Sequence, residues 1–171
     1  FSNKTDQKEF VDAVEETEKD IENIMSIKGD LVVDEVHREL GKVVWDKVGM
    51  ARDKMGLNHA IDSIPKIKEK FWKNISIPGS DKDMNQELEK ALRLKDFIEL
   101  AELMAHDALD RNESCGAHFR EEYQTSENEA ERNDKDFKYV AAWGYNKNGK
   151  PSLFKEELKY KNVKLKTRSY K

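Results

Sequence analysis

Four stretches in which apolar residues recur every three or four positions constrain this 171-residue chain to a mainly helical fold. The first stretch predicts a helix at residues 5–28, with Gly29 as its C-terminal stop. The second predicts a helix at residues 33–55 that ends at Gly56. The side chains that set these two periods are Phe10, Val14, Thr17, Ile21 and Ile24, then Val33, Val36, Leu40, Val43, Val44 and Val48.

Two further helices are expected. The third carries apolar residues between Ile61 and Trp72 and contains Pro65, so it either kinks at the proline or starts near Ser63. The fourth, at residues 82–112, is the longest, and about 30 residues at ~1.5 Å each would span roughly 45 Å. The tryptophans lie on apolar stripes and are interpreted as core residues: Trp45, Trp72 and Trp143.

The last part of the chain has a different pattern. Residues 124–135 are polar and aperiodic, which predicts a loop, and residues 137–145 are aromatic and favour a strand. A turn at 146–149 and a second extended segment within 151–165 would complete a hairpin. We therefore predict a mainly α fold: an antiparallel three- to four-helix bundle resembling a spectrin repeat, residues 1–123, followed by a small β-containing extension with a basic tail, residues 124–171.

Charge is distributed unevenly along the chain, whose net charge is −4. From Lys138 to Lys171 there are ten Lys or Arg and two Glu, a balance of +8, so the preceding part carries −12. The interpretation is a tail that docks on acidic neighbours in its own protein or complex. Nucleic-acid binding is the alternative, but the acidic remainder would repel a polyanion. No apolar run approaches the ~20 residues of a membrane-spanning helix, so no direct span is expected.

A dense polar cluster follows the fourth helix, around Gly116. Such a cluster predicts either a contact surface of fixed geometry or a salt-bridged cap of the helix, and the residues alone leave both open. We take its members as interface candidates: Arg111, Glu113, Ser114, His118, Arg120 and Tyr123.

No catalytic, cofactor-binding or metal site is predicted in this chain. Residues 144–150 match GxxxxGK, but Pro151 stands where a phosphate-binding loop needs Ser or Thr. Cys115 and His118 lack a third partner for nucleophilic catalysis, and Glu102 with His106 is a single helical pair rather than a metal site.

Residues 111–123, RNESCGAHFREEY, resemble a signature near the end of the flavoprotein subunit of succinate dehydrogenase and fumarate reductase, R-x-E-S-R-G-A-H-x-R-x-D-Y. Cys115 stands where the family has Arg, and Glu122 where it has Asp. Residues 44–52 are similar to the family's W-D-x-V-G-x-x-R helix, and residues 131–137 to its E-R-D-D-x-x-W loop. Two further segments resemble its closing strand and tail: 158–160 and 168–170.

The resemblance, over residues 34–171, implies that the chain is a C-terminal piece of a longer subunit. The FAD-binding fold and the dicarboxylate residues would lie upstream, so the isolated chain is expected to be inactive. Its partners would be the upstream flavin domain and an iron–sulfur subunit bound to a membrane anchor. The parent would then be cytoplasmic, at the inner face of the membrane. The alternatives are a C-terminal fragment of an L-aspartate oxidase, which the basic tail disfavours, and a stand-alone helical interaction module.

Overall fold

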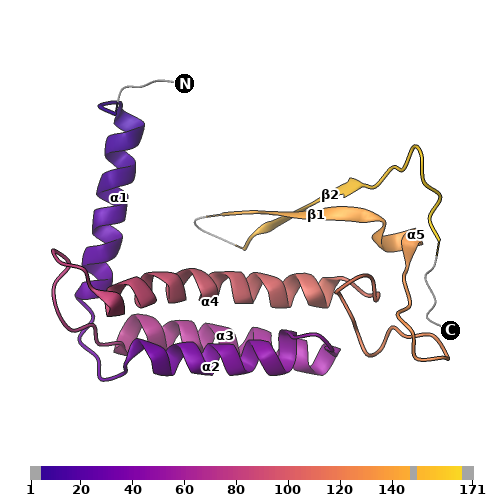
Figure 1. Ribbon diagram of the computed structural model, residues 1–171, viewed down its shortest axis with the longest axis horizontal. Helices are drawn as coiled ribbons and strands as arrows, with labels where there is room; N and C mark the ends of the chain where they lie inside the picture. Colours follow the sequence, from indigo (N-terminus) through magenta and orange to yellow (C-terminus); the bar gives the residue numbers. More distant parts are fainter. Residues whose placement is uncertain (1–4, 147–149, 167–171) are drawn as a thin grey trace.

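The computed structural model describes residues 5–146 and 150–166. Three helices pack side by side as a bundle: α2 (Val33–Val48), α3 (Lys54–Asn74) and α4 (Gln86–Asp110) (Figure 1). The core consists of apolar side chains that recur at helical spacing on the facing sides of these helices, among them Val36, Leu40, Ile64, Phe71, Leu94 and Ile98. The predicted mainly α bundle with a small β extension is therefore confirmed, and the number of bundled helices is three.

The first helix, α1 (Lys8–Met25), lies outside the bundle. It stands away from the other helices and packs on α4 only near its own C-terminal end (Figure 1). Its period predicted a helix correctly, but the period alone could not tell whether its apolar stripe would be buried.

The boundary between α2 and α3 differs from the predicted helix over residues 33–55. The helix ends at Val48 because Gly49 follows, where a Cβ atom would lie 2.4 Å from the Trp45 carbonyl oxygen. A new helix then starts after Asp53, whose side chain accepts a hydrogen bond from the Gly56 N–H at 2.7 Å. Gly56 thus lies in the first turn of α3 rather than ending α2. The third helix does not start near Ser63 but runs from Lys54 through Ser63 and Pro65 to Asn74.

The fourth helix is shorter at both ends than the predicted range 82–112. It begins after Asn85, whose side-chain oxygen accepts from the N–H groups of Glu87 and Leu88, both at 3.1 Å.

The C-terminal extension holds a short helix, α5 (Asp134–Phe137), and an antiparallel hairpin. Strands β1 (Tyr139–Gly144) and β2 (Ser152–Glu157) pair from Tyr139 opposite Glu157 to Gly144 opposite Ser152. The predicted hairpin is present, with a second strand shorter than 151–165. Its turn, at 146–149, lies mostly outside the described residues, as does the tail segment 168–170.

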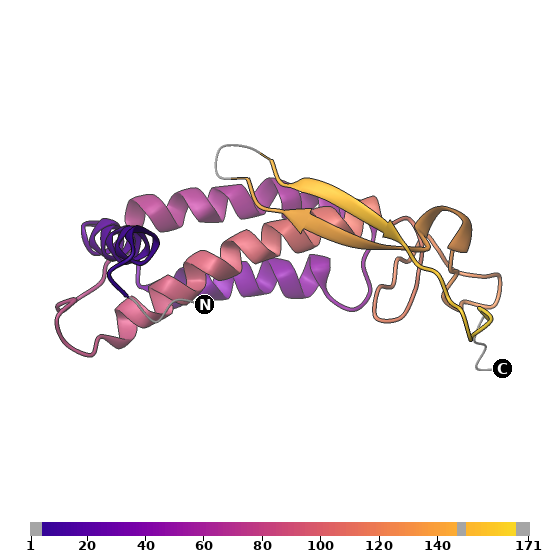
Figure 2. The ribbon, with the colours of Figure 1, turned by 90° about the horizontal axis from the view of Figure 1, so that it is seen from above.

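The hairpin crosses over the C-terminal half of α4 (Figure 2). Trp143 on β1 donates from Nε1 to Asp107 of α4 at 2.7 Å, and Lys155 on β2 lies over the Tyr139 ring. Trp143 and Trp72 are half-buried, but Trp45 is 84% exposed, so the prediction that it is a core residue was wrong. Among the described residues, none of the helices combines the length and apolar character needed to cross a bilayer.

Candidate functional site: the signature loop at the end of the bundle

Residues 111–123, here called the signature loop, close the C-terminal end of α4. Arg120 is 1% exposed, and its Nη1 donates to the carbonyl oxygens of Ala108 at 2.8 Å and Leu109 at 3.3 Å. These carbonyls belong to the last turn of α4, where the helix itself supplies no partner. A buried guanidinium therefore caps the helix in place of a terminal glycine.

The middle of the signature loop is held by hydrogen bonds to backbone groups. The Ser114 hydroxyl accepts from the Arg120 N–H at 2.9 Å and donates to the Arg120 carbonyl at 3.1 Å. Inside that clamp, Cys115 and His118 exchange backbone hydrogen bonds of 2.8 and 3.0 Å. The turn between them requires Gly116, whose φ is +60°. The loop has one defined shape because its polar groups satisfy one another.

Glu113 joins the bundle to the C-terminal extension. Its carboxylate is 2% exposed, and one of the carboxylate oxygens lies 2.6 Å from Nη1 of Arg111. The other oxygen accepts from the Asn133 N–H, at the start of α5, at 2.8 Å. Breaking such a buried pair leaves an uncompensated charge, which typically costs about 3–5 kcal/mol.

Arg111 extends this joint to β1. Its guanidinium also donates to the carbonyl oxygens of Phe137 at 3.2 Å and Tyr139 at 3.1 Å, and lies 4.9 Å from the centroid of the Tyr139 ring. The signature loop is thus bonded to both the short helix and the hairpin of the extension.

His118 faces inward beside several arginines. Its Nε2 lies 2.9 Å from the Arg111 carbonyl oxygen, and since a carbonyl can only accept, Nε2 carries the proton. Burial lowers the pKa of His118, and the positive charges of Arg52, Arg120 and Arg111 lower it further, against the opposing effect of the Arg111 carbonyl bond. His118 is therefore neutral at neutral pH and acts as a hydrogen-bond donor.

Arg52, in the α2–α3 connection, belongs to the same cluster although it was not among the candidate residues. Its N–H donates to the Phe119 carbonyl at 3.3 Å, and its own carbonyl accepts from the Glu121 N–H at 2.9 Å. Burial, together with the neighbouring charge of Arg120, lowers the pKa of Arg52. The signal that could have found it was its place at the end of the W-D-x-V-G-x-x-R pattern.

Glu122 and Tyr123 complete the contacts of Arg120. One Glu122 oxygen lies 3.2 Å from Nε of Arg120, and the other accepts from the Lys54 N–H at the start of α3. Burial works to raise the pKa of Glu122, but these hydrogen bonds outweigh it and hold the pKa below its usual value. The Tyr123 ring lies 5.4 Å from the Arg120 guanidinium carbon. Arg120 thus links the end of α4 to the beginning of α3.

The chemistry of the cluster is that of a structural joint. The Cys115 thiol has a pKa raised by burial and by Glu113, whereas a nucleophilic cysteine needs a lowered one. In the part of the chain that the structure describes, no group of His, Cys, Asp and Glu residues is arranged to hold a metal ion. The structure brings together all six interface candidates, Arg111, Glu113, Ser114, His118, Arg120 and Tyr123, and their role toward a partner stays a prediction.

Most of this chain, including the signature loop, is similar to known proteins. Residues 37–170 match the family model described as the fumarate reductase flavoprotein C-terminal region. An uncharacterized FAD-dependent oxidoreductase of Methanocaldococcus jannaschii is 36% identical over 70% of this chain and 21% of its own length. The fumarate reductase flavoprotein subunit of Proteus vulgaris is 31% identical over 86% of this chain and 23% of its own length. The chain thus spans about a fifth of the length of these relatives.

Solved structures share the fold. A chain of an E. coli quinol fumarate reductase mutant superposes with a TM-score of 0.78 at 23% identity, covering 92% of this chain and 26% of its own. Mycobacterium smegmatis Sdh1 gives a TM-score of 0.73 at 21% identity, covering 88% of this chain and 24% of its own. At these identities the likeness establishes the fold.

Proposed function

Because this chain belongs to the family described as the fumarate reductase flavoprotein C-terminal region, we propose that it serves as the C-terminal helical part of a flavoprotein subunit that interconverts fumarate and succinate. The observation that carries this proposal is the extent of the match, which runs from α2 through the signature loop to the tail. An accidental likeness in a stand-alone helical module would not extend across four-fifths of the chain in one register.

The flavin of such a subunit finds no fitting residues here. Binding the pyrophosphate of FAD uses closely spaced glycines at a strand-to-helix turn, so that the backbone can approach it. No two of the eight glycines in this sequence are one residue apart, and the described strands form a hairpin. FAD would supply the hydride chemistry in the upstream part of the subunit, and no step of that chemistry is assigned to this chain.

The role of this chain would be to brace the flavin domain and to contact other subunits. The hydrogen bonds of Arg111, Glu113 and Arg120 support it, because they join the end of α4 to α5 and to the hairpin. Its partners would be the upstream flavin domain and an iron–sulfur subunit, with the parent on the cytoplasmic, inner face of the membrane through its partner subunits. The interface candidates and the basic tail would supply contacts.

The test compares the 171-residue chain with the full-length subunit. Each protein is mixed with FAD, passed through gel filtration and examined by visible spectroscopy, then assayed for succinate oxidation and fumarate reduction with an artificial electron carrier. We expect a flavin band and turnover from the full-length subunit alone. A flavin band retained by the short chain would show that the assignment of the cofactor site to the upstream part is wrong. A full-length subunit with neither a flavin band nor turnover would overturn the proposal.

A further inference from the structure

Helix α1 consists of two parts with different surroundings. The inner part is attached to α4, where Asp20 lies 2.7 Å from Nζ of Lys95 and Ile24 is fully buried. In the outer part, every residue from 5 to 19 is exposed, and the helix stands clear of the bundle (Figure 1). The outer part is therefore a helix without tertiary support from the described residues.

An apolar seam runs along this helix from the core into solvent. Phe10, Val14, Thr17, Ile21 and Ile24 follow spacings of four and three, the period of residues that pair helices. Phe10 and Val14 are 48% and 56% exposed, and Val11 beside them is 44% exposed.

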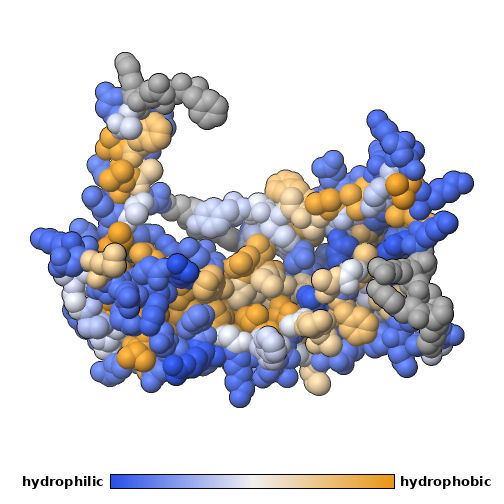
Figure 3. All heavy atoms as spheres, in the orientation of Figure 1, coloured by the Kyte–Doolittle hydropathy of each residue, from blue (hydrophilic) through white to orange (hydrophobic). Residues whose placement is uncertain are grey.

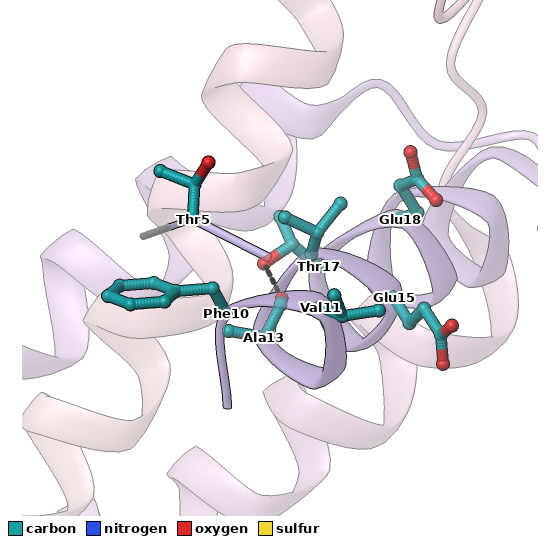
Figure 4. Close-up of a pocket in the computed structure, with 8 residues that line it drawn as sticks. Thr5, Phe10, Val11, Ala13, Glu15, Thr17 and Glu18 are labelled. Atoms are coloured by element: carbon teal, nitrogen blue, oxygen red, sulfur yellow. Dashed lines mark hydrogen bonds between the residues drawn. The ribbon is translucent and has the colours of Figure 1, made fainter. Parts of the chain in front are cut away.

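Figure 4 shows Phe10, Val11, Ala13 and Thr17 lining a shallow hollow on the outer part of α1. The Thr17 hydroxyl donates to the Ala13 carbonyl at 2.8 Å, so it needs no polar partner outside the helix. A helix of about twelve residues is marginal in water without tertiary contacts, so this seam calls for a covering surface.

We propose that the outer part of α1 is a docking helix that packs, through this seam, on the upstream part of the same subunit. The inference rests on the proposed function, because it requires the chain to continue upstream. The relatives are between four and five times as long as the matched region, and the family model describes their C-terminal end. The upstream part would be tethered at the free end of α1, where covalent linkage gives an effective concentration on the order of millimolar.

Charge argues against a second copy of the chain as the occupant. Helix α1 has seven acidic and two basic residues, a net charge of −5, so pairing two copies would bring like charges together. Glu15 and Glu18 flank the hollow, which suits an apolar surface bordered by Lys or Arg. Apolar side chains also continue from α1 onto the bundle beneath it, so the docking surface need not end at the helix (Figure 3).

Amide hydrogen exchange of α1 tests this occupant directly. It is measured in the 171-residue chain at two concentrations, in the full-length subunit alone and in that subunit with its partner subunits. We expect fast exchange of residues 8–19 in the short chain and at least about tenfold slower exchange in the full-length subunit alone. Protection that increases with the concentration of the short chain would overturn the proposal in favour of a second copy of the chain. Protection that appears only when the partner subunits are added would overturn it in favour of those subunits.

A pair of variants in the full-length subunit links the protection to the seam. Val14→Asp should return exchange of residues 8–19 to the rate in the short chain, whereas Met84→Asp, at a 98% exposed residue outside α1, should not change it. Equal protection in both variants would contradict the docking. Flavin content and turnover are also measured on the unsubstituted full-length subunit. If that subunit is active but its α1 is unprotected, this inference alone is overturned, and if it binds no flavin and is inactive, the proposed function is overturned.

Discussion

The two ends of the helical bundle expose and bury opposite kinds of side chain. At the signature loop, Glu113 and Arg120 are buried charged residues whose hydrogen bonds lie within this chain. At α1, Phe10 and Val14 are apolar and exposed. Burying a charge is costly unless it is paired, whereas an exposed apolar seam gains free energy only when another surface covers it. The buried charges at the first end are thus paired within the chain, whereas the apolar seam at the second end would gain from the neighbour that we propose.

The largest effect should come from Arg120→Met, which keeps the volume of the side chain but removes its donors. The carbonyls at the end of α4 and the Glu122 carboxylate would lose their partner, and we expect a loss of about 3–5 kcal/mol in the free energy of unfolding. Urea denaturation of the 171-residue chain measures it. Arg93→Met, on the helix α4 that Arg120 caps, is the matched control, because the ion pair of Arg93 with Glu89 is exposed and should contribute below about 1 kcal/mol. Equal losses would remove the contrast between buried and exposed arginines.

Glu113→Gln should have the next largest effect. The amide retains the shape of the carboxylate but removes the charge between Arg111 and the Asn133 N–H, and charge-assisted bonds contribute about 1.5–3 kcal/mol each. Comparing the short chain with the full-length subunit sharpens the interface prediction. An equal loss in both proteins would make Glu113 a local joint, and a larger loss in the full-length subunit would support its role as an interface residue.

The pH dependence of stability should reveal His118. Since its pKa in the folded chain lies below the ordinary 6.5, the unfolded state binds more protons below that pH, and stability falls as the pH drops through this range. We expect the urea midpoint to fall between pH about 7 and about 5, and to fall less in His118→Gln, whose amide can still donate to the Arg111 carbonyl. The exposed His59, changed to Gln, is the control. An identical pH profile for H118Q and the unchanged chain would contradict this assignment.

The smallest effect on the isolated chain should come from Val14→Ser on the outer part of α1. An exposed substitution away from packing typically changes stability by no more than about 0.5 kcal/mol. Ile24→Ala, in the buried part of the same seam, should cost about 2–5 kcal/mol. Thermal unfolding of both variants measures the difference. A large loss for V14S in the short chain would mean that the outer helix is already covered without any neighbour.

Much of the fold was predictable because its signals are local. The period of three and four residues predicted all four long helices, and the aromatic strand, turn and second strand predicted the hairpin. The density of charges around Gly116 identified a real cluster, although density alone could not choose between a cap and a contact surface. The geometry now shows a capped helix and a joint to the hairpin, through Arg120 and Arg111.

The positions that sequence reasoning missed depend on contacts distant in the chain. Arg52 joins the signature loop through backbone bonds to residues 119 and 121. The W-D-x-V-G-x-x-R pattern ends at this arginine, but a local pattern does not say which distant segment the residue contacts. Trp45 lies on a helical stripe, but the neighbouring helices pack against the other side of α2, and its ring is exposed.

The sequence by itself determined which segments form helices and strands, because periodicity, capping residues and turn residues act within a few positions of one another. It also determined the family, through the signature and its flanking patterns. Only the tertiary structure decided that α1 leaves the bundle, that α3 continues through Pro65, and that Glu113 and Arg120 are buried and paired. These outcomes depend on which surfaces meet in space, and burial of an apolar stripe or a charge is a property of both surfaces rather than of one segment.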